Sequence, residues 1–336
     1  MAENVTIPLT SGELGFLWES YHCETMFLCT FQYFKTVADD NDLHKNLQSG
    51  IEITESNIQA IKEVFIKEKL PIPGAFDEHD VNLNTPKLYS DQTINYLLKE
   101  MSETRFEIYS KYLKMTSRLD IRALCNQFIT DYNRFCHQVT ETLLNKGLYV
   151  RAPQIPYPDD VDFVKNKSYL TGWFGERRPV EANQLAHISL NIQRNTLLKT
   201  MLIGFIQTVE SDKIRDLLEV GKVMSDKMLE SLHLFLKDAD LQAPIQSGLS
   251  VMKSTKAPFS DRFVLEFLLN ITHCAISVYG ESLALSKRRD LFVFYEKSIT
   301  GTTLYANQIA NLLIELGYLE QPPIATDYED LANKRD

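Results

Sequence analysis

The chain has 336 residues, of which 44% are hydrophobic and 24% are charged, an ordinary balance for a globular protein with a substantial core. Its formal net charge of −10 disfavours binding to nucleic acid or to an anionic membrane surface, because both need a basic face. No apolar run reaches the roughly 18 residues of a membrane span, and residues 1–11 lack the basic start and apolar stretch of a secretory signal.

Apolar residues at helical spacing predict a long first helix from Glu13 to Ala38 and a second one that ends near Leu70. Between them, the polar run at 39–42 supplies side chains that can cap the second helix. The second helix stops at the run LPIPG, residues 70–74, because proline cannot continue a helix. A connection of roughly 20 residues follows, which is long beside the two to eight usual in a helix bundle.

Ser90 and Asp91 predict the start of a third helix, and a tight break at 117–120 separates it from a fourth. Gly147 ends the fourth helix, since glycine readily takes the left-handed conformation that follows a helix end. Short, long and short connections indicate two antiparallel hairpins joined by one crossover. This is the ferritin-like arrangement of a four-helix bundle.

The whole pattern then occurs a second time. An offset of 171 residues places Leu14 on Leu185, and after the long connection an offset of 170 places Ser90 on Ser260. The difference of one residue falls in a loop, where insertions are tolerated. The sequence therefore predicts an all-α protein made of two tandem ferritin-like four-helix bundles, each with one long crossover between its second and third helices.

This repeat divides the chain into three parts. The first bundle with its proline-rich tail is predicted to cover residues 1–160, and the second bundle with its own tail covers 179–336. Residues 161–178 have no counterpart in the second copy and are predicted to connect the two bundles.

Gly50 and Gly221 recur at the same position in the second helix of each copy. A glycine in the middle of a helix costs up to about 1 kcal/mol relative to alanine. Its recurrence suggests that another backbone or a large side chain approaches closely there. The alternative is that two surface glycines coincide by chance.

The connector contains Trp173, Phe174, Arg177 and Arg178, which put two aromatic rings beside two guanidinium groups. One interpretation is a staple packed between the bundles. The other is an interaction patch, because Trp and Arg are enriched at binding hot spots. The sequence predicts protein partners or self-association without identifying the partner. A further basic run, residues 287–289, is predicted to be a solvated surface turn.

The runs GLYVRAPQIP at 147–156 and GWFGERRP at 172–179 resemble the domain of unknown function 3231 family. The resemblance covers essentially the whole chain, and the joining stretch is its most specific part. Proteins of this family are two-repeat proteins of endospore-forming bacteria, described as spore-coat-like with ferritin-like helical bundles. The resemblance implies the fold and a cytoplasmic or spore-associated location, and it implies no catalytic residues.

A ferritin-like bundle raises the question of a di-iron site, which needs an inward Glu on two helices and Glu-x-x-His on the other two. The chain has one such motif, Glu230 to His233, in the second helix of the second copy. The aligned residues of the first copy are Gln59 and Lys62, and helical geometry turns Glu230 toward solvent. Glu230 and His233 are therefore weak candidates, and the sequence predicts no metal site and no cofactor.

Other motifs for chemistry are missing from the sequence. It has no Gly-x-Ser-x-Gly and no glycine-rich phosphate loop, and its five cysteines lack Cys-x-x-Cys spacing. The sequence therefore predicts a non-enzymatic structural or interaction protein whose bundle interiors are apolar. Two alternatives stay open: a bundle that binds a small apolar ligand between its helices, and a ferritin-like metal-dependent oxidase. An apolar cavity with a few convergent polar groups would favour the ligand alternative.

Overall fold

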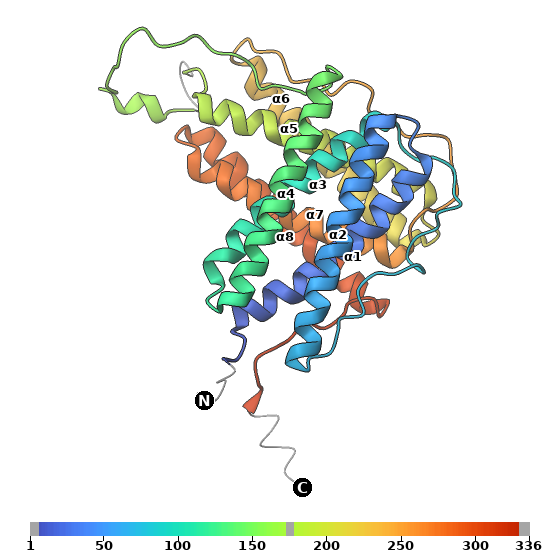
Figure 1. Ribbon diagram of the computed structural model, residues 1–336. Coiled ribbons are helices and arrows are strands. Elements are labelled where there is room, and N and C mark those ends of the chain that lie inside the picture. The colour runs from blue at the N-terminus through green and yellow to red at the C-terminus, as the bar shows by residue number, and fades with distance from the viewer. Residues whose placement is uncertain (1–6, 173–177, 329–336) are drawn as a thin grey trace.

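The structure is a computed structural model that describes residues 7–172 and 178–328, and its regular elements are all helices (Figure 1). The first half contains α1 (Ser11–Val37), α2 (Asn41–Glu68), α3 (Asp91–Tyr112) and α4 (Leu119–Asn145). The second half contains α5 (Ala182–Thr208), α6 (Asp212–Lys237), α7 (Asp261–Leu285) and α8 (Arg289–Glu315). Two short 3-10 turns complete the regular elements, η1 (Leu113–Met115) and η2 (Lys167–Leu170).

Each half consists of two helical hairpins that one long connection joins. Helix α1 packs on α2 and α3 on α4, and the second half repeats this with α5 on α6 and α7 on α8. The connections between the hairpins span residues 69–90 and 238–260. Figure 1 shows both of them along the same edge of the molecule. The predicted fold of two tandem ferritin-like bundles with one crossover each is thus confirmed.

Capping groups fix the helix ends at equivalent places in the two halves. The side chains of Asp40, Ser90 and Ser260 accept hydrogen bonds from the first backbone N–H groups of α2, α3 and α7. Gly147 and Gly317 follow α4 and α8 with φ angles of 64° and 68°, a left-handed conformation that glycine adopts without strain. The helix boundaries therefore follow from local sequence signals.

The two crossover connections pair with one another and so join the halves. Isolated antiparallel bridges link Val81 with Phe259 and Tyr89 with Val251. At an offset of 170 residues, Val251 is equivalent to Val81 and Phe259 is equivalent to Tyr89. The two bridges therefore join equivalent pairs of positions. The halves therefore meet about an approximate two-fold axis, as the subunits of a symmetric dimer do.

Four aromatic rings pack around this axis: Phe34, Phe205, Tyr89 and Phe259. Within the halves, the ring centroids of Phe34 and Tyr89 lie 6.3 Å apart and those of Phe205 and Phe259 lie 6.4 Å apart. Between the halves, the centroids of Phe34 and Phe259 lie 6.4 Å apart and those of Tyr89 and Phe205 lie 6.3 Å apart. All four pairs are edge-to-face, a favourable geometry for aromatic rings. The hydrophobic core consequently runs from one half into the other.

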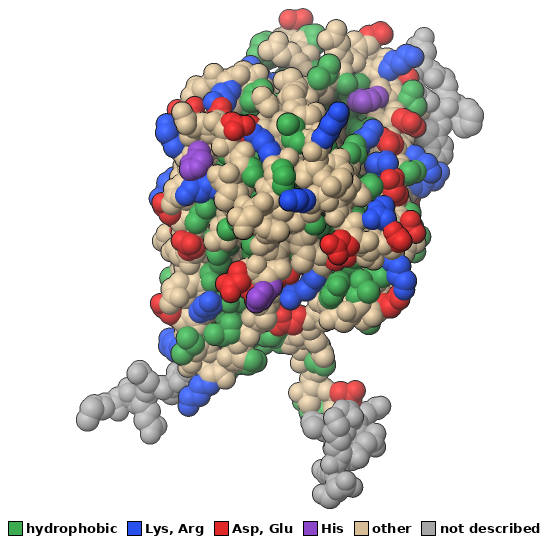
Figure 2. Space-filling model, turned by 90° about the vertical axis from the view of Figure 1, so that its right-hand side faces the viewer, with side chains coloured by type: hydrophobic (Ala, Val, Ile, Leu, Met, Phe, Trp, Pro, Cys, Tyr) green, Lys and Arg blue, Asp and Glu red, His purple; other side chains and the backbone are tan. Residues whose placement is uncertain are grey.

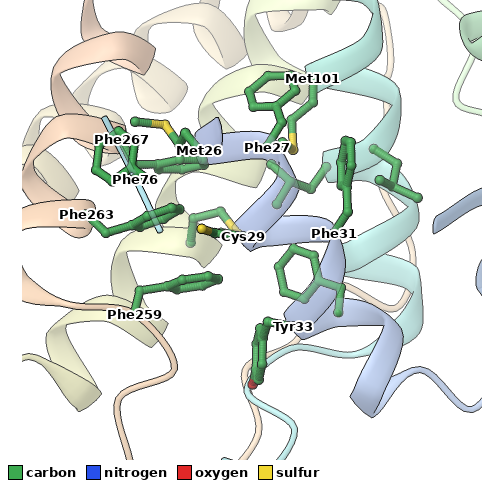
Figure 3. Close-up of a cluster of buried hydrophobic side chains, with 14 of the residues drawn as sticks. Met26, Phe27, Cys29, Phe31, Tyr33, Phe76, Met101, Phe259, Phe263 and Phe267 are labelled. Carbon is green, nitrogen blue, oxygen red and sulfur yellow. The ribbon is translucent and has the colours of Figure 1, made fainter. Parts of the chain in front are cut away.

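The second half adds a stack of aromatic rings along α7. The rings of Phe259, Phe263 and Phe267 are nearly parallel, with centroids 4.4 and 5.9 Å apart. Figure 3 shows them facing Met26 and Cys29 of α1. Since burial of apolar surface is the main stabilising term in folding, this contact between α1 and α7 helps to hold the halves together.

Large side chains do approach the two recurring glycines, as predicted. A Cβ at Gly50 would lie 2.9 Å from Cδ2 of Phe31 and 3.1 Å from Cζ of Phe135. At Gly221 it would lie 2.4 Å from the hydroxyl oxygen of Tyr305. Phe135 and Tyr305 are equivalent residues of α4 and α8. In each half, glycine therefore lets an aromatic side chain of the fourth helix lie against the second helix.

We expect Gly221→Ala to lower the free energy of unfolding by about 1–2 kcal/mol. The new methyl group would displace Tyr305, whose hydroxyl donates to the Leu217 carbonyl at 2.8 Å. Urea denaturation measures the change. The control Gly301→Ala in α8, where nothing lies within 4 Å of the new Cβ, should instead stabilise by up to about 1 kcal/mol. Stabilisation by both substitutions would contradict the close approach of Tyr305.

The basic run at 287–289 is only partly a solvated turn, which corrects the prediction. Arg288 is 1% exposed, and its Nε and Nη2 donate to the two carboxylate oxygens of Asp290, each at 2.9 Å. Arg118 and Asp120 form the same pair in the first half, at 2.8 and 2.9 Å. The signal for this buried pair was the Arg-x-Asp spacing, which recurs at an offset of 170 residues.

Among the helices of the described chain, only α7 is long and apolar enough to meet the criterion for a membrane-spanning helix. Its most apolar stretch has a mean hydropathy of 1.4. Of that stretch, 44% is buried inside the protein. A core helix of a globular protein passes the same test, and α7 carries the stacked core rings of Phe263 and Phe267. That the chain does not insert into a membrane stays a prediction.

Candidate functional site

The structure describes one residue of the predicted interaction patch. Three others lie outside the described residues: Trp173, Phe174 and Arg177. The guanidinium carbon of Arg178 lies 3.9 Å from the centre of the Tyr169 ring, and its Nη2 donates to Glu181 at 3.0 Å. Arg178 therefore fastens the connector to the start of α5, and a role in binding a partner stays a prediction.

The surface that Figure 2 shows has acidic and basic side chains interspersed, and its hydrophobic side chains form only small groups. The weak metal candidates Glu230 and His233 are both exposed on α6. Within residues 7–172 and 178–328, no group of three or more His, Cys, Asp or Glu side chains is placed to hold a metal ion. The described chain thus offers no ferritin-type ligand set.

A cavity of about 100 Å³ lies between the two halves. Helices α1 and α3 of the first half and α5 and α7 of the second line it, and equivalent positions such as Leu97 and Phe267 line it from both halves. Its wall is mostly apolar, with side chains that include Met26, Phe27, Met101, Leu198 and Met201. Protein interiors are normally close-packed, and a designed apolar cavity of about 150 Å³ binds benzene. The cavity is about two-thirds of that volume, which is room for a ligand of only a few heavy atoms.

Polar side chains enter the cavity wall from both halves. Arg194 of α5 forms an ion pair with Glu100 of α3, with 2.5 Å between Nε and the carboxylate. Arg105 of α3 is 1% exposed, and its Nη1 donates to Glu19 at 2.9 Å. Its Nε and Nη2 have no hydrogen-bond partner among the described residues, and neither have Oε2 of Glu19, Nε of Arg194 and Oδ1 of Asn191. Because buried polar atoms are nearly always paired, these atoms mark a place for a polar group that the described chain does not supply.

Beside Arg105, the first half buries a carboxyl group at its centre. Glu24 of α1 is fully buried, and the hydroxyls of Tyr109 and Tyr132 donate to its two oxygens, the second at 2.9 Å. The guanidinium carbon of Arg105 lies 4.4 Å from the centre of the Tyr109 ring. Burial raises the pKa of Glu24 to about 7, although Arg105 and the two hydroxyls act in the opposite direction. The mostly apolar interior of the first half therefore contains a buried, hydrogen-bonded carboxyl group.

The second half has a neutral amide at the equivalent place. The offset of 171 places Glu24 on Asn195, and the offset of 170 places Tyr109 on Tyr279. Asn195 is buried and its Nδ2 donates to the Tyr279 hydroxyl at 3.1 Å. Both halves thus keep a buried hydrogen-bonded centre, but only the first carries an ionisable group there. The signal that could have found it was a glutamate within the apolar stripe of the first helix.

The thiols of the cavity wall are poor nucleophiles. Cys23 and Cys274 line the cavity, and all five cysteines of the chain are free. Burial raises the pKa of Cys23 well above its ordinary value and that of Cys274 to about 11. Since the thiolate is the reactive form, both side chains stay protonated near neutral pH. The wall is therefore better suited to binding a molecule than to attacking one.

Comparison with known proteins gives one match over nearly the whole chain and two weaker ones. A candidate spore coat protein from Bacillus halodurans C-125 has a solved structure with a TM-score of 0.42 and 13% identity, which covers 45% of this chain and 98% of that one. The curated protein described as probable kinetochore protein SPC24 of Kluyveromyces lactis is 24% identical over 147 residues, which are 44% of this chain and 71% of that protein. The model of the family described as protein of unknown function (DUF3231) matches residues 3–161 and 168–331. Because this match spans both halves, the chain belongs to the DUF3231 family, as the runs at 147–156 and 172–179 indicated.

Proposed function

We propose that this chain is a non-enzymatic binding protein that takes a small, largely apolar molecule into the cavity between its halves. The observation that carries the proposal is the cavity itself, about 100 Å³ in volume and lined by apolar side chains from four helices. Ligands of helical proteins are commonly held between helices, in apolar pockets with a few polar groups that fix orientation. Arg105 and Asn191 are polar groups of this kind.

The chemistry of the wall supports binding without catalysis. Glu100, the carboxylate that lines the cavity, forms an ion pair with Arg194. The thiols of Cys23 and Cys274 stay protonated, because burial raises the pKa of both. The structural role and the spore association that the family resemblance implies stay predictions beside this proposal. Three of the four residues on which an interaction patch was predicted lie outside the described chain.

We expect benzene to stabilise the protein by about 1.4 kcal/mol at ten times its dissociation constant. The matched pair of variants is Ala275→Leu, which adds three carbon atoms to the cavity wall, and Ala284→Leu, which adds them to an exposed position of the same helix. Benzene binding should be lost in Ala275→Leu and kept in Ala284→Leu. Calorimetric titration and thermal unfolding with and without benzene measure both effects.

Two results would contradict the proposed function. One is wild-type protein that does not bind benzene, which would mean that the cavity does not admit a small molecule. The other is undiminished binding to a folded Ala275→Leu variant, which would place the binding site elsewhere. Near-ultraviolet circular dichroism shows whether each variant keeps the native packing of its aromatic side chains.

A further inference from the structure

Arg105 gives the cavity a chemical preference. We propose that the molecule bound in the cavity is a small monocarboxylic acid, aromatic or short-chain aliphatic, whose carboxylate is bound by Arg105. This inference rests on the proposed function and names the class of ligand. It is carried by a buried guanidinium that lines an apolar cavity and has two nitrogens without a hydrogen-bond partner among the described residues.

The two unpartnered nitrogens of Arg105 are Nε and Nη2, which lie along one edge of the planar guanidinium. This edge forms two parallel hydrogen bonds with the two oxygens of a carboxylate, the geometry that makes arginine the preferred partner of carboxylates. The third nitrogen, Nη1, donates to Glu19 at 2.9 Å. A ligand carboxylate would therefore complete the hydrogen bonding of Arg105 without displacing Glu19.

Neighbouring groups of the protein do not complete the pairing of Arg105. The two oxygens of Glu24 already accept hydrogen bonds from Tyr109 and Tyr132. The Tyr109 hydroxyl also interacts with the guanidinium, and Glu19 pairs with Nη1. Even so, Nε and Nη2 of Arg105 and Oε2 of Glu19 are left without a hydrogen-bond partner among the described residues. Leaving buried donors unpaired is unfavourable, and more so when the group is charged. A ligand that supplies acceptors at this point would remove that cost.

Both arginines of the wall, Arg105 and Arg194, already form ion pairs, with Glu19 and Glu100 respectively. The preference for a carboxylate therefore comes from the unpartnered edge of Arg105 and not from an excess of positive charge. The rest of the wall is apolar, and the cavity is smaller than the one of about 150 Å³ that binds benzene, so the body of the ligand is limited to about six carbon atoms or fewer. Benzoate combines both features and is a suitable probe.

The test compares benzoate with benzyl alcohol and benzene, first in the wild type, where no variant has to fold. We expect benzoate to bind at least about 10-fold more tightly than benzyl alcohol, because a hydrogen bond to a charged group is stronger than one between neutral groups. In Arg105→Met, benzoate affinity should fall between about 10-fold and 100-fold while benzene affinity changes less than about 3-fold. Arg105→Lys keeps the positive charge but cannot form two parallel hydrogen bonds with a carboxylate. Its affinity for benzoate should lie between that of the wild type and that of Arg105→Met.

The matched control is Arg134→Met, which removes an exposed arginine of α4 that does not line the cavity. It should change benzoate affinity by less than about 3-fold. Benzene binding without a preference for benzoate would overturn this inference and leave the proposed function standing. Equal loss of both ligands in a folded Arg105→Met variant would contradict the role of Arg105. Failure of all three probes to bind the wild type would overturn the proposed function as well.

Discussion

Gly204→Ala is expected to lower the free energy of unfolding by about 3 kcal/mol, at the upper end of the range for an overpacked core. A Cβ at Gly204 of α5 would lie 2.3 Å from the hydroxyl oxygen of Tyr89 and 2.5 Å from its ring carbons Cε1 and Cζ. The Tyr89 ring has little room to move, because it is fully buried and its hydroxyl donates to the Met201 carbonyl at 2.7 Å. The substitution would therefore strain the contact between the first crossover and the second half.

The structure gives a reason why only one half has a glycine at this position. Gly204 is equivalent to Tyr33, and Tyr89 is equivalent to Phe259. On the other side of the axis, Tyr33 packs edge-on against Phe259 with 5.3 Å between the ring centroids. Two large rings thus meet on one side, and a large ring meets a glycine on the other. The two halves have diverged in a complementary way, so each contact depends on its own pair of residues.

Urea denaturation of Gly204→Ala measures this effect, and Gly280→Ala in α7 is the matched control. Nothing lies within 4 Å of a Cβ at Gly280, so that substitution should stabilise by up to about 1 kcal/mol. A second test is a double-mutant cycle with Tyr89→Leu, which should show a coupling energy of at least about 1 kcal/mol. If Gly204→Ala were as stable as the wild type, the packing of Tyr89 against α5 would be contradicted.

The parts of the fold that the sequence predicts are those with local or periodic signals. Stripes of apolar residues, caps such as Ser90 and Ser260, and a terminal glycine such as Gly147 each act within a few residues, and the duplication makes each signal appear twice. The pairing of the two crossovers gave no such signal. It depends on contacts between residues about 170 positions apart, in segments that have no periodic pattern.

The candidate site could not be predicted from the sequence for a related physical reason. A cavity is the space that side chains from several helices leave unfilled, so no residue by itself indicates it. Glu24 lies within the apolar stripe of the first helix, which indicates burial, but its partners Tyr109 and Tyr132 lie on two other helices. Arg105 likewise lies within an apolar stripe, four residues from both Met101 and Tyr109, but the sequence does not show what its guanidinium faces. Its burial follows from the second half, which supplies the opposite wall of the cavity.

We expect Glu24→Gln to raise the free energy of unfolding by up to about 3 kcal/mol at pH 8 and to change it little at pH 4. Burial raises the pKa of Glu24 from its ordinary value of 4.5 to about 7 in the folded protein. Below pH 4.5 the carboxyl is protonated in both states and has no effect on stability. Between pH 4.5 and 7 the unfolded chain loses this proton while the folded protein keeps it, so the wild type loses stability as the pH rises. Above pH 7 the loss is complete, at about 1.4 kcal/mol per unit of pKa difference.

Glutamine removes this pH dependence because it has the shape of glutamate and does not ionise. Its amide can accept a hydrogen bond from one of the two tyrosine hydroxyls and donate to the oxygen of the other. The second half already shows that a neutral amide is accommodated here, since Asn195 pairs with Tyr279 at the equivalent position. Urea denaturation of both proteins from pH 4 to pH 9 gives the difference in stability directly. Contributions of other titrating groups are common to both proteins and cancel in that difference.

The control for this measurement is Glu141→Gln, an equal change of charge at an exposed position of α4. Its stability should follow that of the wild type at every pH, because the Glu141 side chain is exposed and the substitution removes no buried contact. If Glu24→Gln also followed the wild type from pH 4 to pH 9, Glu24 would have to ionise as readily in the folded protein as in the unfolded chain. That would require water at the centre of the first half, and the burial of Glu24 against Tyr109 and Tyr132 would then be contradicted.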